Sequence, residues 1–143
     1  MTDDEREVFL REANVAVLSS VDSRGRPHAA PVWYLYDNGV FRISTGVGSQ
    51  KHKNIEANPN ISLVIDQRVL PYYAVMVQGT AEIGPAFSGE DGLKLAVRYL
   101  GEELGTRYAQ TQTAEGSISL TIRPRKVIVY DPMPAGASAS RPS

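Results

Sequence analysis

The stretch HAAPVWYLYDNGVFRIS, residues 28–44, decides the fold. Two runs rich in β-branched and aromatic residues flank Asn38-Gly39, a pair that tolerates the positive φ angles of a tight turn. Such a pair between apolar runs predicts a β-hairpin. Pro31 has no N–H group for a strand ladder, so its position is expected at a sheet edge, at a bulge or beside a ligand. The stretch therefore predicts antiparallel strands.

Further β-rich runs on both sides of this hairpin are separated by turn-forming residues. The predicted strands are residues 14–21, 28–36, 40–44, 61–66, 72–83 and 117–130, the last of them interrupted at Pro124. Strands and helices do not alternate strictly, which disfavours a doubly wound nucleotide-binding fold. The pattern predicts a mainly β protein, built as a small and nearly closed antiparallel barrel.

Three segments predict helices at the ends of this barrel. Thr2 begins a capping box, and the helix that follows is expected to end near Asn14. Ser49 caps a second helix, which Pro59 stops. The third helix begins at Gly89 and has apolar residues at spacings of three and four. This stripe is expected to face the core and consists of Leu93, Ala96, Val97, Leu100 and Leu104.

The length of 143 residues suits a single domain that buries about two thirds of its unfolded surface. We expect this domain to span residues 1–131. Residues 132–143 are rich in Pro, Ala and Ser and are expected to be disordered. One core should therefore carry all the predicted elements.

The composition argues against several classes of protein. Fifteen basic and sixteen acidic residues give a net charge of −1, which provides no overall attraction for nucleic acid. No apolar run approaches the ~20 residues that a membrane span requires. The acidic N-terminus lacks the features of a signal peptide and the chain has no cysteine, so a cytoplasmic location is expected.

Few residues suggest catalytic chemistry of their own. His28 and His52 are the only histidines and lack carboxylates at ligand spacing, so we expect no metal site. The sequence contains no nucleophile elbow, dinucleotide fingerprint or P-loop. Asp22 lies in a turn, where a carboxylate commonly accepts hydrogen bonds from nearby backbone N–H groups. No catalytic residue is assigned.

The stretch STGVGSQKHKN, residues 44–54, is the strongest candidate for a binding site. Lys51 and Lys53 lie near the start of a predicted helix, where unpaired N–H groups favour anions and acidic side chains are usual. The glycines allow the preceding backbone to turn its amides inward. Hydroxyl donors are added by Ser44, Thr45 and Ser49. These groups suit a phosphate or a carboxylate, although solvated lysines on a surface helix explain the same pattern. His52 is expected to point to solvent.

Longer stretches resemble a known superfamily. Residues 24–66 and 73–83 resemble the pyridoxamine 5′-phosphate oxidase-like split barrels and, within them, the flavin/deazaflavin oxidoreductases that use coenzyme F420. The most specific pieces are Arg26-Pro27-His28, Pro31-Val32-Trp33-Tyr34, Ser49-Gln50-Lys51, Asn54, Asn58-Pro59 and Val77-x-Gly79-x-Ala81. The resemblance implies an antiparallel split β-barrel of six to seven strands with two to three short helices, similar to FMN-binding proteins.

The resemblance also implies a homodimer with the cofactor in a groove between the subunits. The implied phosphate contacts are Lys51 as the main one, Ser44, Thr45, Ser49 and Gln50 as neutral donors, and Lys53 as a weaker partner of the phosphate or the oligoglutamate tail. The cofactor ring would lie along Pro31, Val32 and Trp33. A tryptophan in a strand is equally expected in the core. Met76, with Tyr72 and Tyr73, would line the groove from the partner subunit or belong to the barrel core.

Departures from the FMN-using oxidases favour F420 over FMN. Those oxidases carry an arginine and a lysine in the second strand where this sequence has Ala30 and Leu35, and an arginine where it has Gln50. Each lost charge-assisted hydrogen bond is worth about 1.5–3 kcal/mol. The oxidases also carry a C-terminal segment for substrate binding and dimerisation where this sequence has its Pro/Ala/Ser-rich tail. Pyridoxamine phosphate oxidation is therefore not expected.

The function that the resemblance implies is an F420-dependent oxidoreductase, which transfers a hydride between the deazaflavin and a small unsaturated or conjugated organic substrate. Such a cofactor carries the difficult chemical step, which agrees with the lack of an evident catalytic acid or base. One alternative is an FMN-dependent reductase of the same fold. Another is a non-catalytic module that binds F420 or haem.

Overall fold

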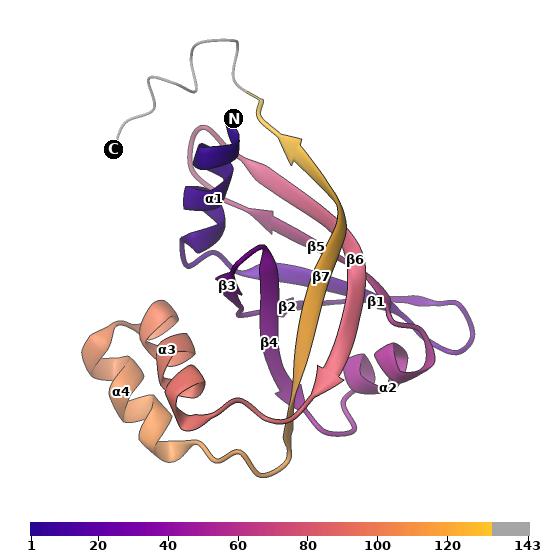
Figure 1. The fold of residues 1–143 in the computed structure, drawn as a ribbon, viewed down its shortest axis with the longest axis vertical. Coiled ribbons are helices and arrows are strands. Elements are labelled where there is room, and N and C mark those ends of the chain that lie inside the picture. Colours follow the sequence, from indigo (N-terminus) through magenta and orange to yellow (C-terminus); the bar gives the residue numbers. More distant parts are fainter. Residues whose placement is uncertain (133–143) are drawn as a thin grey trace.

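The computed structural model describes residues 1–132, which form one antiparallel sheet of seven strands and four helices (Figure 1). The strands are β1 (Ala16–Val21), β2 (Pro27–Val32), β3 (Leu35–Asp37), β4 (Val40–Gly46), β5 (Asn60–Asp66), β6 (Ala74–Gly84) and β7 (Ser117–Tyr130). The helices are α1 (Asp3–Arg11), α2 (Gln50–Ala57), α3 (Gly89–Leu100) and α4 (Glu102–Thr111). The predicted tail lies outside the described residues except for residue 132.

The order of strands in the sheet shows that the barrel is nearly closed. The order is β2-β1-β5-β6-β7-β4-β3, so β2 and β3 are the two edges of one sheet although they follow each other in the chain. Only Trp33 and Tyr34 lie between them. The sheet must curl until its two edges are neighbours, because the three Cα–Cα steps from Val32 to Leu35 span at most about 11 Å. The predicted split-barrel fold is confirmed, whereas the single strand predicted over residues 28–36 is wrong.

The core fills the inside of the curled sheet and is closed at one end by α1 (Figure 1). Its largest fully buried side chains are Phe9, Leu18, Tyr34, Phe41, Ile43, Leu63, Ile65, Tyr73, Val75, Val77, Leu120 and Ile122. Tyr34 spans this core, and its hydroxyl donates to the carbonyl of Leu10 at 2.9 Å. Tyr73 packs edge-on against Phe9, so this tyrosine belongs to the core rather than to a groove.

The predicted turn and edge chemistry is confirmed around residues 28–44. Asn38 and Gly39 have φ angles of 51° and 75° and join β3 to β4 as a tight hairpin. Pro31 lies on β2, which is an edge strand, so its missing N–H costs no ladder hydrogen bond.

The longest ladder of the sheet joins β6 to β7 and contains an irregularity at Gly79. Pro124 does not split the last strand, because the register shifts by one residue between Gln78 and Gly79 and β7 continues past the proline. The backbone approaches closely here: a Cβ on Gly79 would lie 2.3 Å from the carbonyl oxygen of Arg123. Only glycine therefore fits this position without a shift of the backbone.

The helices differ in part from the prediction. The capping box at Thr2 is present, but α1 ends at Arg11 rather than near Asn14. Gly101, with a φ angle of 85°, ends α3 and begins α4, so there are four helices in the described residues rather than two or three. The predicted core stripe is wrong for Leu93 and Leu104, which are 40% and 48% exposed. These two helices form a hairpin beside the barrel rather than a plug in its core (Figure 1).

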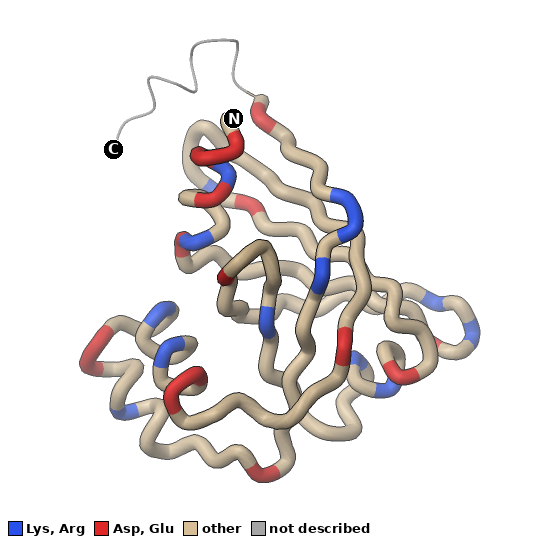
Figure 2. The backbone as a smooth tube through the Cα atoms, viewed as in Figure 1, with Lys and Arg blue, Asp and Glu red and all other residues tan. Residues whose placement is uncertain are grey.

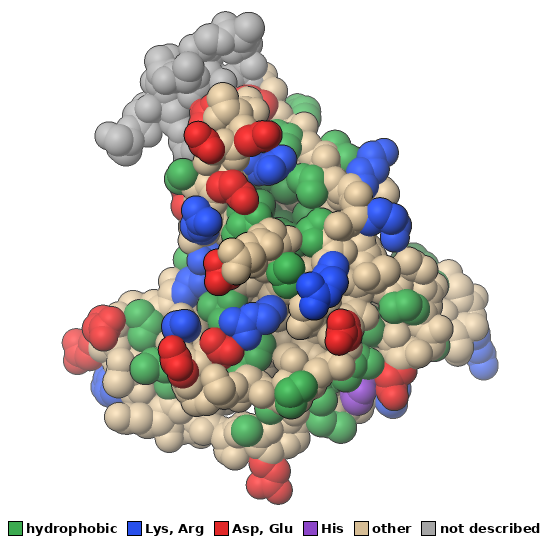
Figure 3. Space-filling model, in the orientation of Figure 1, with side chains coloured by type: hydrophobic (Ala, Val, Ile, Leu, Met, Phe, Trp, Pro, Cys, Tyr) green, Lys and Arg blue, Asp and Glu red, His purple; other side chains and the backbone are tan. Residues whose placement is uncertain are grey.

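Charged residues of both signs are distributed along the backbone, and they are intermixed on the face drawn in Figure 3 (Figures 2 and 3). Within residues 1–132, no helix is long and apolar enough to cross a membrane.

The turn between β1 and β2 is organised by the carboxylate of Asp22. It accepts hydrogen bonds from the backbone N–H groups of Arg24 and Arg26, at 2.9 and 3.0 Å, and from Nε2 of His28 at 2.9 Å. The bond from His28 and the backbone bond from Arg26 hold the pKa of Asp22 well below its usual range. Asp22 therefore has the turn role that the sequence predicted.

The Asp22→Asn variant tests this role through its pH dependence. A carboxylate with a depressed pKa stabilises the fold at all pH values above its unfolded pKa of about 3.9 and loses this effect as the pH falls toward the folded pKa. We expect a lower melting temperature than wild type at pH 7 and a difference that shrinks below about pH 4. The exposed Asp37→Asn variant is the control and should melt like wild type at both pH values. An equal loss for Asp22→Asn at all pH values would contradict the prediction.

Candidate functional site

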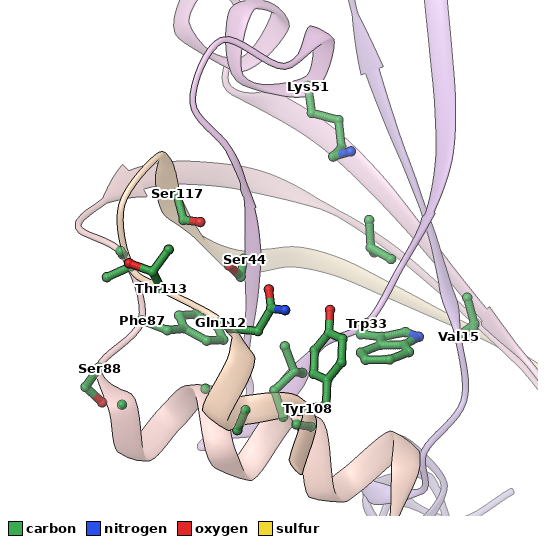
Figure 4. A pocket seen from close by; sticks show the side chains of 18 of the residues that line it. Val15, Trp33, Ser44, Lys51, Phe87, Ser88, Tyr108, Gln112, Thr113 and Ser117 are labelled. Carbon is green, nitrogen blue, oxygen red and sulfur yellow. The ribbon is translucent and has the colours of Figure 1, made fainter. Parts of the chain in front are cut away.

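The main pocket has a volume of about 640 Å³ and lies between the β2 edge of the barrel and the α3–α4 hairpin (Figure 4). Its lining residues are Val15, Pro31, Val32, Trp33, Ser44, Lys51, Ala86, Phe87, Ser88, Gly89, Gly92, Leu95, Ala96, Tyr108, Ala109, Gln112, Thr113, Ala114 and Ser117. This volume is typical of sites for small molecules and cofactors.

The two ends of this pocket differ in chemistry. Lys51 lies at one end, away from the hairpin, and is the one residue of the described lining with a formal charge (Figure 4). Trp33 and Tyr108 face each other at the other end, with ring centroids 6.4 Å apart. Such an arrangement suits a ligand that has an anionic group at one end and a flat apolar ring at the other.

Lys51 also lines a second, smaller hollow of about 160 Å³. The other residues of this hollow are Leu18, Ser20, His28, Ala29, Ala30 and Gln50. Ala30 and Gln50, at two of the three positions where the FMN-using oxidases carry a cation, thus flank Lys51 directly. Leu35 is different: it lies on β3, at the other edge of the sheet, and lines neither hollow.

The helix start that presents Lys51 is capped as predicted. The Ser49 hydroxyl accepts from the backbone N–H of His52 at 3.3 Å. His52 itself does not point to solvent: its side chain is 15% exposed, and Nδ1 accepts from the N–H of Gly48 at 2.9 Å. The prediction for this histidine is wrong because the ring satisfies a loop amide.

The loop before α2 does not turn its amides toward a ligand. The N–H of Val47 donates to Gly116 and that of Ser49 donates to Gly46, while Gly48 is bound by His52. All three donors are thus used within the chain. The backbone donors left for an anion are those that begin α2, at Gln50 and Lys51, because the first N–H groups of a helix have no intrahelical acceptor.

The other predicted phosphate contacts lie at different places. Ser44 is exposed and lines the main pocket. Thr45 is buried, and its hydroxyl lies 3.3 Å from that of Ser49, so both hydroxyls serve the helix cap. Gln50 borders the second hollow, and Lys53 is exposed and lines neither hollow. The structure therefore brings Ser44 and Lys51 together in the main pocket and leaves Lys53 outside it.

A chain of polar side chains, buried at Asn54 and Ser20, fixes α2 against the barrel. Nε2 of Gln50 donates to Oδ1 of Asn54 at 2.7 Å, and Nδ2 of Asn54 donates to the Ser20 hydroxyl at 3.0 Å. Asn54 and Ser20 are each only 2% exposed. Since the amide uses both its donor and its acceptor, it sets the rotation of α2 relative to β1 and with it the position of Lys51.

The predicted ring contacts from the second strand lie together in the main pocket. Pro31 and Val32 are the last residues of β2, and Trp33 follows them in the link to β3. Trp33 is half-buried and stacks on Tyr99, with centroids 4.8 Å apart and planes 6° apart. Of the two interpretations of this tryptophan, the structure supports a pocket wall rather than the barrel core.

Met76 lies outside both hollows. It is on β6, paired with Val64 on one side and Ile128 on the other, on the outer face of the sheet. Tyr72 is 51% exposed in the loop before this strand. Neither residue contributes to the pocket within its own chain.

Sequence reasoning missed the wall that the α3–α4 hairpin supplies. Phe87, Tyr108 and Gln112 point into the pocket from this side (Figure 4). The spacing of Tyr108 and Gln112, four residues apart, suits one face of a helix, but no separate helix is predicted for this segment from the sequence. Recognising Gly101 as a helix terminator would have indicated α4.

The hairpin is joined to the barrel by an ion pair beside the pocket. Arg42 on β4 makes two hydrogen bonds to the carboxylate of Asp91 on α3, at 2.7 and 3.3 Å. The guanidinium holds the pKa of Asp91 below its usual range, and it also lies 5.4 Å from the ring centroid of Phe87. The ion pair thus fixes the start of α3 and the adjacent aromatic wall.

Comparison with known proteins agrees with this geometry. The family model described as pyridoxamine 5′-phosphate oxidase matches residues 2–131. This chain belongs to the pyridoxamine 5′-phosphate oxidase family. A family member from Rubrobacter xylanophilus, named pyridoxine/pyridoxamine 5′-phosphate oxidase, is 34% identical over 116 residues, which are 80% of this chain and 52% of that protein. The chain spans about half or less of the length of the curated oxidases it matches.

Two solved structures show the same fold. A protein named F420 reductase has a TM-score of 0.72 at 26% identity, and the match covers 85% of this chain and 94% of that one. A conserved hypothetical protein from Mycobacterium tuberculosis has a TM-score of 0.75 at 22% identity, over 98% and 95% of the two chains. The split barrel of this family member is therefore shared with an F420 reductase.

The Asn54→Ala variant tests the chain that positions α2. Removing the amide leaves the buried Ser20 hydroxyl without its donor, so we expect a loss of about 1–3 kcal/mol in the free energy of unfolding, measured with urea. The exposed neighbour Lys53→Ala is the control and should change this free energy by less than about 0.5 kcal/mol. Equal stabilities of the two variants would show that the chain does not hold the helix.

Proposed function

We propose that this protein is an F420-dependent oxidoreductase, which reduces a small unsaturated or conjugated organic substrate. One observation carries the proposal: a single pocket has Lys51 at one end and the flat rings of Trp33 and Tyr108 at the other. A deazaflavin cofactor has the matching chemistry, with a phosphate on a flexible arm and a planar ring. When bound, it would supply the hydride.

The residues of the chain fit this cofactor by charge and shape. Lys51 and the first N–H groups of α2 would hold the phosphate, and Ser44 would donate a further hydrogen bond. Pro31 and Val32 add apolar surface to the pocket lining, and the indole of Trp33 gives the ring a flat surface. The protein would thus bind and orient the reactants.

The choice of F420 over FMN follows from the few cations near Lys51. Ala30 and Gln50 border the same small hollow as Lys51, and neither can form a charge-assisted hydrogen bond to a phosphate as an arginine would. The likeness to a protein named F420 reductase supports the same choice. FMN is the competing ligand in the titration that tests this choice.

A titration with F420 and FMN side by side tests the cofactor. Fluorescence of Trp33, the one tryptophan of the chain, should report F420 binding at micromolar concentration and weaker binding of FMN. Oxidation of reduced F420 in the presence of enones and quinones then tests the reaction. Tighter binding of FMN would replace the proposed cofactor, and tight F420 binding without turnover of any acceptor would indicate a binding module.

The variants Lys51→Ala and Lys53→Ala separate a specific phosphate contact from general positive charge. Each removes one lysine from the same helix, but only Lys51 lines the pocket. We expect Lys51→Ala to weaken F420 binding about tenfold or more, equivalent to ~1.4 kcal/mol, with little change in melting temperature. Lys53→Ala should bind within about twofold of wild type. Equal effects of the two variants would overturn the assignment of Lys51.

We also propose that the protein forms a homodimer through the outer face of its sheet. An apolar row crosses four adjacent strands there and consists of Val17, Val64, Met76 and Ile128, which are paired in register. Pro31, which lines the pocket, pairs with Val17 and so continues the row to the pocket. A second subunit on this face would bury these side chains and border the pocket, which gives Met76 a place near the cofactor.

The Val64→Asp variant tests this interface. Val64 is 36% exposed at the middle of the row, so a charge there would be buried without a partner in the dimer. We expect wild type to sediment as a dimer at micromolar concentration and Val64→Asp to sediment as a monomer with weaker F420 binding. Val69→Asp is the matched control, because Val69 is 64% exposed in a loop outside the row, and it should remain dimeric. A monomeric wild type, or a dimeric Val64→Asp variant, would refute the interface.

A further inference from the structure

Trp33 occupies an unusual position for a residue that forms a binding surface. It belongs to the link between β2 and β3, outside both strands, so no ladder of the sheet fixes its orientation. A half-buried side chain on such a link would have rotamer freedom, and ordering it on binding would weaken the affinity for a ligand. Something outside the sheet must hold the indole.

Tyr99, in the last turn of α3, supplies this support through its ring. The ring lies parallel to the indole of Trp33, at 4.8 Å between centroids and 6° between planes. One face of the indole is therefore covered by Tyr99. On the pocket side, Trp33 is approached by Tyr108 at 6.4 Å with a tilt of 58°, which leaves the indole as a wall of the pocket.

The hydroxyl of Tyr99 holds the Tyr99 ring in place through two hydrogen bonds. It accepts from the backbone N–H of Tyr34 at 3.1 Å and donates to the carbonyl of Asn14 at 2.8 Å. The first bond holds the residue next to Trp33 in the chain, and the second reaches the segment that leads into β1. Tyr99 thus contacts the side chain of Trp33 and the backbone that follows it.

Arg98, the residue before Tyr99, joins α3 to the end of α1. Its guanidinium donates to the carbonyls at the end of α1, to Arg11 and Glu12 at 2.6 Å each and to Leu10 at 3.2 Å. It therefore fastens α3 to α1 and stabilises the fold. Arg98 does not line the pocket, but its guanidinium carbon lies 5.4 Å from the ring centroid of Tyr99 and 4.8 Å from that of Tyr34. A substitution that keeps a cation over these rings therefore separates the stability of this junction from the shape of the binding site.

We infer that Tyr99 is a positioning residue of the pocket: it holds the indole of Trp33 as a preformed flat wall against which a planar ligand ring stacks. The identity of that ligand rests on the proposed function, but the support of Trp33 by Tyr99 does not. The role of Tyr99 differs from that of Arg98, which adjoins it, and this difference makes the inference testable.

The test compares Tyr99→Leu, Tyr99→Phe and Arg98→Lys with wild type in three measurements. Near-ultraviolet circular dichroism of the free protein reports the environment of its one tryptophan, Trp33. Titration gives the dissociation constant for F420, and thermal unfolding gives the melting temperature. Phe keeps the stacked ring and loses the hydroxyl, Leu loses both, and Lys keeps the charge of Arg98 without its planar fork.

We expect Tyr99→Leu to lose the tryptophan signal of the free protein and to weaken F420 binding about three- to tenfold. Tyr99→Phe should retain the signal and rescue binding to within about twofold of wild type, despite a lower melting temperature. Arg98→Lys should also melt at a lower temperature, with the tryptophan signal and the dissociation constant unchanged.

Two results would overturn the inference. One is a Tyr99→Leu protein with the wild-type tryptophan signal. The other is a dissociation constant that follows the melting temperature across all three variants, because Tyr99 would then be structural in the same way as Arg98. If wild type does not bind F420, the proposed function fails, whereas the circular dichroism of the free proteins still decides whether Tyr99 positions Trp33.

Discussion

The link of two residues between β2 and β3 is the constraint on which the rest of the structure depends. It connects the two edges of a seven-stranded sheet, so the sheet has to curl into a barrel. Tyr34 secures the closed form from inside, since its ring is fully buried and its hydroxyl donates to the carbonyl of Leu10. Burial raises the pKa of this hydroxyl well above its usual range, which favours the protonated form that donates this hydrogen bond. The other residue of the link, Trp33, lines the pocket, so the two residues that close the barrel also supply part of the pocket wall.

The remaining wall of the pocket is the α3–α4 hairpin, which is joined to the barrel mainly by side chains. The helices α3 and α4 pack so closely that a Cβ on Gly105 would lie 2.6 Å from the Cα of Val97. The ion pair between Arg42 and Asp91 holds the beginning of α3, and Arg98 holds its end against α1. The space left between this hairpin and the β2 edge is the pocket, which explains why its lining comes from segments far apart in the sequence.

The site offers few charged groups and few free backbone N–H groups to an anion. The loop before α2 uses its amides for its own hydrogen bonds, so an anion would depend on the Lys51 side chain and on the N–H groups that begin the helix. A site with one cation is suited to a ligand that gains much of its affinity from ring stacking and apolar contact. This balance agrees with a pocket whose other end is aromatic.

The sequence by itself determined the local elements of this protein: the Asn38-Gly39 hairpin, the Thr2 and Ser49 caps, the Asp22 turn and the edge position of Pro31 could all be predicted, because each rests on backbone preferences of a few neighbouring residues. Family resemblance extended this to the split barrel. The tertiary structure alone decided the break after Val32 and the wall formed by Tyr108 and Gln112. These features depend on contacts between segments that are distant in the chain, and no local preference encodes such contacts.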